Sequence, residues 1–404
     1  MIISAPTKAL SQREFIGLIA MNFAMVAFSI DAMLPALPDI GAQISPDVIN
    51  RAQLVLTSFV FGMGFGTLFA GPLSDRFGRK PVIFAGTLIF LLGGALATIA
   101  QSLETMVIAR VIQGLGVAGP RIVTIAIVRD LYRGRQMARI MSYAMLIFTL
   151  VPAVAPLVGA GIIASLGWRY IFVACMLFGV LCLAWLMIRQ PETLPIERRK
   201  TIRPVELWQA TRECFGHKVF AVSSLGQVLA LGMLFAALSS TQQIFEEVYG
   251  RGDSFPLWFA LIAILGGAAS IINARLVVRL GMLRMVLVGF GLQIIISGLA
   301  TLLSIAGMLG FAFYLFWATS VFFMAGLLIG NLNTLAMEPL GHIAGLAASV
   351  IGSVSTVLSL VIAVPVGLAF DGTTLPLAAS LLLFSILGIL LMQMQPREIE
   401  QQPT

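Results

Sequence analysis

Long apolar runs recur along the whole chain, and they limit the possible folds more than any other feature. Each run is roughly twenty residues long, enough to cross a hydrocarbon core of about 30 Å at 1.5 Å per residue. Of the 404 residues, 59% are hydrophobic and 11% are charged, whereas soluble domains carry about 25% charged residues. A water-soluble fold could not hide so much apolar surface, so the sequence predicts a membrane protein.

Helices are the expected spanning elements, because no water satisfies backbone polar groups inside a bilayer. A membrane β-barrel would show short alternating strands instead. We therefore predict an all-α polytopic protein. Apolar runs and turn signals place its twelve transmembrane helices near residues 15–35, 52–71, 81–100, 104–127, 138–164, 169–189, 218–245, 255–278, 283–306, 309–336, 342–369 and 374–394.

Lysines and arginines indicate the orientation of these helices. Twelve spans put both termini on one side, and only Arg51, Arg169 and Arg251 then fall on the opposite side, with Arg110 and Arg121 inside spans. The basic side is cytoplasmic by the positive-inside rule, so we expect a multi-pass protein of the bacterial inner membrane with both termini in the cytoplasm. We also expect the protein to be a monomer. The net charge of +7 is spread between spans, so we expect the lipid bilayer and no nucleic acid as a partner.

Residues 190–217 form the longest polar segment and divide the spans into six plus six. We expect an N-terminal bundle at 1–189, a cytoplasmic linker at 190–217 and a C-terminal bundle at 218–404. The loops after the second and eighth spans agree, since Leu73, Arg76 and Gly78 match Leu276, Arg279 and Gly281 at a constant offset of 203 residues. Such internal similarity is typical of transporters built from duplicated halves.

Several segments resemble a known transporter family. The loop Gly71-Pro-Leu-Ser-Asp-Arg-Phe-Gly-Arg-Lys resembles the G-x-L-a-D-r-x-G-r-r/k motif of the major facilitator superfamily. Four further segments resemble its bicyclomycin/chloramphenicol resistance (Bcr/CflA) branch: Asp31-Ala-Met-Leu-Pro-Ala-Leu-Pro, Ile127-Val-Arg-Asp-Leu-Tyr, Gly167-Trp-Arg-Tyr-Ile-Phe and Glu338-Pro-Leu-Gly-His-Ile-Ala-Gly. The resemblance implies two pseudo-symmetric six-helix bundles and multidrug efflux by drug:proton antiport.

Asp31 is the only carboxylate that we place well within a span. An ionised carboxylate in a low-dielectric setting is costly, so it tends to take up a proton or to find a partner. Asp31 is thus a candidate proton carrier, although Pro35 and Pro38 also permit a capping or solvated residue at the helix end. Arg110, in a segment that resembles the helix 4 motif of proton antiporters, lies toward the same membrane half. Its guanidinium either takes part in proton coupling or extends to the nearby interface.

Arg121 lies eleven residues after Arg110, three helical turns on and about 16 Å deeper. It either lines the cavity or reaches the cytoplasmic interface, and the sequence leaves both readings open.

The loop motif is a candidate gate. Its residues are Gly71, Asp75, Arg76, Gly78 and Arg79, with Asp130 further along. The resemblance implies a cytoplasmic latch in which Asp75 meets the start of helix 11 near residues 341–345 and Arg79 pairs with Asp130. A loop that is merely solvated is the alternative, but it gives no reason for the acidic residue.

The helices that line the central cavity in this superfamily carry neutral polar and adaptable apolar residues here. The candidates for substrate contact are Asn22, Met25, Met33, Gln113, Gln227, Phe235, Asn331 and Asn333. Hydrogen bonds between helices and ordinary packing are the alternative roles. In the fifth span Pro152, Pro156 and Gly159 resemble the antiporter motif, but Ala155 and Ala160 replace two of its glycines.

No metal-ligand spacing, phosphate loop or nucleophile–base set occurs in the sequence. We therefore expect no catalytic residue, no metal and no cofactor, and a chain that is not an enzyme but a transporter driven by a proton gradient. The leading hypothesis is export of a small amphipathic compound. Proton symport of a nutrient is the alternative, and an intramembrane enzyme or sensor is a more distant one.

Overall fold

A computed structural model describes residues 10–199 and 204–395, and the described residues contain helices and no strand. They form two compact units. The described residues of 1–47 and 54–204 make unit 1, and those of 48–53 and 205–404 make unit 2.

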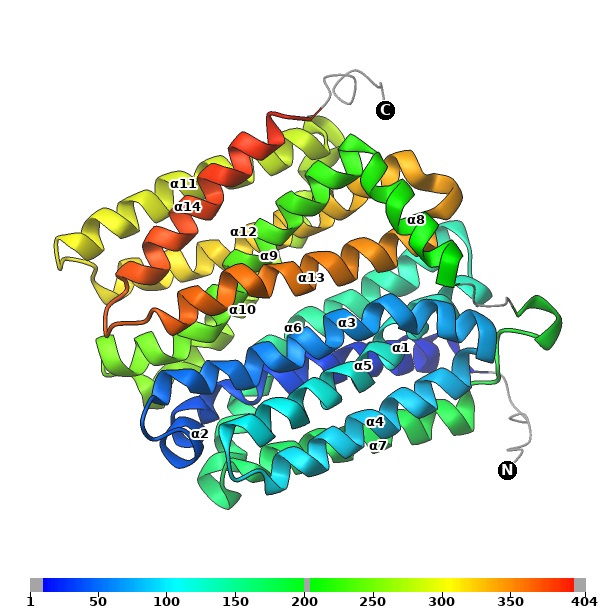
Figure 1. Cartoon of the computed structure of the whole chain (residues 1–404), viewed down its shortest axis with the longest axis horizontal. Coiled ribbons are helices and arrows are strands. Elements are labelled where there is room, and N and C mark those ends of the chain that lie inside the picture. Colours follow the sequence, from blue (N-terminus) through cyan, green and yellow to red (C-terminus); the bar gives the residue numbers. More distant parts are fainter. Residues whose placement is uncertain (1–9, 200–203, 396–404) are drawn as a thin grey trace. The chain divides into compact units, whose positions relative to one another are not determined.

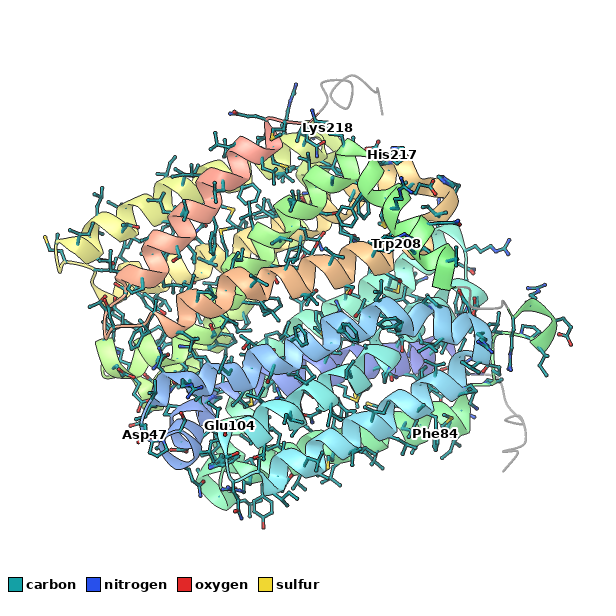
Figure 2. The ribbon with its side chains drawn as sticks, in the orientation of Figure 1. Asp47, Phe84, Glu104, Trp208, His217 and Lys218 are labelled. Carbon is teal, nitrogen blue, oxygen red and sulfur yellow. The ribbon has the colours of Figure 1, made fainter. Side chains whose placement is uncertain are left out.

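Unit 1 is built from long helices and a few short ones (Figure 1). Its elements are α1 (Gln12–Asp31), η1 (Leu34–Ala36), α2 (Leu37–Ile44), α3 (Gln53–Phe77), α4 (Arg79–Ile99), α5 (Leu103–Leu131), α6 (Gly134–Leu166), α7 (Arg169–Arg189) and η3 (Ile196–Arg198). Helix α4 packs against both α5 and α7, and α1 packs against α5, α6 and α7. Asp47 and Glu104 lie at one end of this bundle, and Phe84 lies on α4 nearer the other end (Figure 2).

Unit 2 has the same kind of architecture (Figure 1). Its elements are η2 (Ile49–Ala52), α8 (Pro204–Gly216), α9 (Lys218–Gln243), η4 (Ile244–Val248), η5 (Gly252–Ser254), α10 (Phe255–Leu280), α11 (Met282–Ile305), α12 (Phe311–Met337), η6 (Glu338–Ile343), α13 (Ala344–Leu368) and α14 (Leu375–Met392). Helix α9 packs against α12, α13 and α14, so it occupies the interior of this unit.

By length and composition, eleven helical stretches in the described residues could cross a membrane. One of them, Phe311–Leu368, has 58 residues, which is far more than the roughly twenty that one crossing needs. It consists of α12 and α13, separated by η6, where Leu340 has non-helical dihedral angles. The structure therefore confirms the all-α fold with twelve spans in the part of the chain that it describes.

Two short helices were not expected from the sequence. Helix α1 ends at Asp31, and the chain continues through η1 into α2, each with a proline in its first turn, where a missing N–H costs least. Within the polar segment between the bundles, α8 buries Ala210 and Cys214, four residues apart. Cys214 is buried because helical spacing turns it to the same side as Ala210.

The turns after α3 and α10 share one conformation. Gly78 has φ 101° and Gly281 has φ 81°, values that residues with a Cβ rarely adopt. Each glycine also donates its N–H to a carbonyl four residues earlier, at Ser74 and Val277. The sequence repeat at an offset of 203 residues therefore corresponds to two structurally alike turns, one in each unit.

Helices α4 and α5 approach so closely that side chains are excluded between them. A Cβ on Gly93 would lie 2.3 Å from the backbone nitrogen of Gln113, and one on Gly116 would lie 2.2 Å from that of Phe90. Small residues permit such approach between membrane helices. This packing fixes the rotation of α5 and therefore the direction in which its polar residues point.

Candidate functional site

Asp31 is the last residue of α1 and is 5% exposed. Its carboxylate makes no hydrogen bond or ion pair with any residue that the structure describes. In a span, a carboxylate without such partners is costly when ionised and tolerable when protonated. In this setting the protonated form of Asp31 is therefore favoured unless a cation or a hydrogen-bond donor comes close to the carboxylate.

Arg110 lies on α5 and is fully buried. Its guanidinium donates to the carbonyl of Val55 at 3.0 Å, to the carbonyl of Ser29 at 3.0 Å and to Oε1 of Gln113 at 2.6 Å. The ring centroids of Phe59 and Phe172 lie 4.3 and 5.7 Å from its guanidinium carbon. Backbone oxygens and aromatic faces thus stabilise the cation in the absence of a carboxylate.

These two predicted coupling residues are not paired with each other in the structure. Arg110 contacts the backbone of α1 at Ser29, two residues before Asp31, and the described residues include no ion pair between Arg110 and Asp31. Burial favours the protonated form of this carboxylate.

The loop between α3 and α4 holds a second cluster, centred on Arg79. Its guanidinium forms an ion pair with Asp130 at 2.9 Å, a second ion pair with Asp75, and a hydrogen bond of 2.7 Å to the hydroxyl of Ser74. The structure thus contains the Arg79–Asp130 pair that the resemblance implied. It also places Asp75 on Arg79, which the sequence analysis did not foresee. The contact expected between Asp75 and residues 341–345 stays a prediction.

The other residues of the loop motif have simpler settings. Gly71 lies within the last two turns of α3, Gly78 forms the turn described above, and the guanidinium carbon of Arg76 lies 5.0 Å from the ring centroid of Phe77.

Glu192 belongs to this cluster by its contacts, and the sequence analysis missed it. Its carboxylate accepts the backbone N–H groups of Arg79 and Lys80, each at 3.0 Å, and these are the first two residues of α4. The same carboxylate accepts the N–H groups of Thr193 and Leu194. Glu192 therefore caps α4 from the segment after α7 and interacts with the positive end of its dipole.

The predicted cavity residues of unit 1 are buried. Asn22 donates to the carbonyl of Leu18 at 2.8 Å, and Met25 and Met33 are packed in the interior. Gln113 uses its oxygen for Arg110, while its Nε2 has no partner among the described residues.

In unit 2 the settings of the predicted cavity residues vary more. Asn331 donates to Oδ1 of Asn273 at 2.7 Å, so these two residues join α12 to α10. Gln227 and Phe235 are buried on α9, and Asn333 is half-buried on α12. A role in substrate contact stays a prediction for all the predicted cavity residues.

The three predicted antiporter residues lie on α6. Pro152 and Pro156 are inside the helix, and Gly159 faces α1 so closely that a Cβ would lie 2.0 Å from the carbonyl oxygen of Ala32. Ala32 directly follows Asp31, so α6 contacts the backbone at the candidate proton site. No group of three or more His, Cys, Asp or Glu residues suited to a metal ion occurs among the described residues.

Comparison with known proteins identifies the class. Residues 19–365 match the Major Facilitator Superfamily, and the chain belongs to this family of membrane transporters. The solved structure of a D-xylose-proton symporter has a TM-score of 0.73 with 14% identity, covering 97% of this chain and 99% of that one. At this identity the likeness shows the fold alone.

Curated relatives narrow the family further. The chain is 32% identical over 354 residues to a bicyclomycin resistance protein homolog of Haemophilus influenzae, covering 84% of each chain. It is 28% identical over 347 residues to a chloramphenicol resistance protein of Pseudomonas aeruginosa, covering 78% of this chain and 81% of the relative. The resemblance to the bicyclomycin/chloramphenicol resistance branch is thus confirmed. The chain is a multi-pass transporter of the bacterial inner membrane.

Proposed function

We propose that this chain exports small amphipathic compounds in exchange for protons, by alternating access between the two sides of the membrane. The names of its relatives, resistance proteins for bicyclomycin and chloramphenicol, support an amphipathic drug as the exported compound. The observation that carries the proton coupling is Asp31, a buried carboxylate without a partner among the described residues, at the end of a membrane helix.

In this mechanism Asp31 takes up a proton on the acidic side and releases it on the other. Arg110 keeps its charge because its guanidinium donates hydrogen bonds to oxygens of Val55, Ser29 and Gln113. In the proposal its positive charge favours the ionised form of Asp31. Substrate and proton then oppose each other through charge or through competition for space near Asp31. The proposed substrate contacts are the cavity residues named above, from Asn22 on α1 to Asn333 on α12.

The cluster around Arg79 is the proposed gating element. Its two carboxylates come from different helices, α3 and α5, and Glu192 adds the start of α4 and the end of α7. A cluster that joins four helix ends can favour one conformation over another if one of its contacts exists in only one of these conformations.

The proposed order of parts along the chain is a bundle at 1–189, a linker at 190–217 and a bundle at 218–404. We propose a monomer with both termini in the cytoplasm.

Export rather than uptake is part of the proposal, since the same fold also serves a proton symporter. Pro152, Pro156 and Gly159 of α6 support export, and Ala155 and Ala160 depart from the antiporter pattern. The direction of proton-driven movement distinguishes the two functions.

The test is dye accumulation in inverted membrane vesicles, with and without an imposed proton gradient. We expect wild-type vesicles to accumulate dye when their interior is acidic. Asp31→Asn should lose this accumulation because its side chain cannot ionise, while binding of the dye persists. The control is Asp47→Asn, which removes an exposed carboxylate of the same unit and should behave as wild type. Undiminished gradient-driven accumulation by Asp31→Asn would refute the role of Asp31, and gradient-driven loss of dye would favour symport.

A further inference from the structure

Arg121 is a cation on α5 that the proposed coupling does not use. It is half-buried, and it makes no hydrogen bond, ion pair or ring contact with any described residue. The other arginines inside the bundle differ in this respect. Arg79 and Arg110 donate to several oxygens, and Arg189 pairs with Glu14 at 2.6 Å. An unpaired guanidinium in a membrane span is costly, because it cannot lose its charge.

Reaching the cytoplasmic end of α5 is a poor solution for this side chain. The next charged residue on α5, Arg129, is eight residues further, about 12 Å along the helix axis. Side chains on a helix lean toward its N-terminus, so that of Arg121 leans away from this end of α5.

Asp31 is also an unsuitable partner for Arg121. Asp31 lies two residues after Ser29, whose carbonyl Arg110 contacts, and Arg121 is three turns of α5 from Arg110, about 16 Å along the axis.

A second polar residue without a partner lies one turn from Arg121. Thr124 is fully buried, and its hydroxyl has no hydrogen bond among the described residues. Thr124 is three positions after Arg121, as Gln113 is after Arg110, and residues at this spacing share a helix face. Eleven residues, close to three whole turns, relate the two pairs. In the first pair Arg110 binds Gln113, whereas no hydrogen bond joins the second pair or satisfies the Thr124 hydroxyl among the described residues.

We propose that Arg121 and Thr124 recognise a carboxylate on the transported compound. This inference rests on the proposed transport function and names the substrate class as amphipathic organic acids. A guanidinium can donate two parallel N–H hydrogen bonds to one carboxylate. The hydroxyl of Thr124 would donate a third hydrogen bond to the same carboxylate. The pair binds the acidic group, and the apolar residues of the spans accept the rest of the molecule.

The test uses 2-naphthoate and its methyl ester, which differ mainly in the charge that the proposal invokes. Equilibrium dialysis measures their binding to the full chain in lipid nanodiscs, after subtraction of empty nanodiscs. A charge-assisted pair in a site shielded from water should make wild type bind the acid at least about tenfold tighter than the ester. Arg121→Gln should remove this preference and leave ester affinity within about twofold, and Arg121→Lys should keep part of it.

Two controls make the result specific. Arg135→Gln removes an exposed cation at the start of α6 and should leave the preference intact. Thr124→Val should weaken binding of the acid alone. Failure of wild type to prefer the acid, or an unchanged preference in Arg121→Gln, would overturn the proposal. Gradient-driven accumulation of an uncharged dye tests the transport function separately, because it depends on Asp31 and involves no substrate carboxylate.

Discussion

At the scale of single residues, Glu192 stabilises the start of α4 from a position 113 residues further along the chain. The first N–H groups of a helix lack partners within it, and a carboxylate there satisfies them and interacts favourably with the dipole. Because both carboxylate oxygens are used, one on Arg79 and one on Lys80, the segment after α7 is held in one position. The Arg79 cluster therefore depends on a residue outside the loop motif.

Substitution Glu192→Gln tests this dependence. The amide keeps the size of the side chain but removes its charge and one acceptor oxygen, so we expect a loss of about 1 kcal/mol in stability. In a chain of this size that corresponds to a shift of roughly 2 °C in apparent melting temperature, together with slower transport. Glu197→Gln, at an exposed position on η3, is the matched control. Equal effects of the two substitutions would show that the cap has no special role.

Some site residues could be predicted from sequence and others could not, for physical reasons. Asp31 and Arg110 stand out because charged residues are rare in apolar spans. Glu192 lies in a polar segment where carboxylates are common, so its capping role appears only once α7 and α4 are packed together. The acceptors of Arg110 at Val55 and Ser29 are backbone carbonyls, which leave no signal in side-chain identity.

At the scale of elements, the crossing of α6 and α1 determines the surroundings of Asp31. Gly159 brings the α6 backbone against Ala32, and the neighbouring atom is a carbonyl oxygen that cannot rotate away. Any side chain at this position must push the two helices apart. Gly159 thus permits the close approach of the two helices, next to the candidate proton carrier Asp31.

A pair of glycine substitutions isolates this effect. Gly159→Ala adds a Cβ that would meet the Ala32 oxygen at 2.0 Å, so we expect a destabilisation of about 1–3 kcal/mol and loss of transport. Gly161→Ala adds the same atom to the same helix where nothing lies within 4 Å, and it should change stability by less than about 0.5 kcal/mol. Thermal unfolding and dye accumulation measure both. Normal transport by Gly159→Ala would show that the close crossing is dispensable.

The long elements were predictable because the bilayer fixes their length and polarity together. The short helices α2 and α8 were not, since each has fewer than twenty residues and their buried faces depend on packing within a unit. Helix α8 buries Ala210 and Cys214 although Trp208, two residues before Ala210, is 70% exposed. Such a pattern reads as a polar linker until the neighbouring helices are in place.

At the scale of the whole molecule, topology is the property on which every functional proposal depends. The positive-inside rule predicts that Asp47, between the first two spans, is outside the cell and that α8 is inside. Both sites are exposed, with Asp47 at one end of unit 1 and Trp208 on α8 (Figure 2). Exposed positions suit labelling of introduced cysteines, provided that the native thiols stay silent.

The native thiols meet this condition. Cys175 and Cys182 are buried in α7, and Cys214 is buried on α8. Burial, assisted by the neighbouring Glu213 carboxylate, raises the pKa of Cys214 to about 11. Only the thiolate reacts with maleimides, and below this pKa its fraction falls about tenfold per pH unit, so labelling at pH 7 should be very slow. The rate for this site should rise with pH up to about 11.

With this background, Asp47→Cys should react with a membrane-impermeant maleimide in intact cells, and Trp208→Cys only after permeabilisation. Phe84→Cys serves as a control for lipid exposure, because this side chain is exposed on α4 within a span and should resist the reagent in both conditions. The accessibilities follow from an even number of spans with the basic loops in the cytoplasm. The reverse pattern would place Asp31 and Arg110 toward the cytoplasmic half and would remove the basis for proton entry from outside.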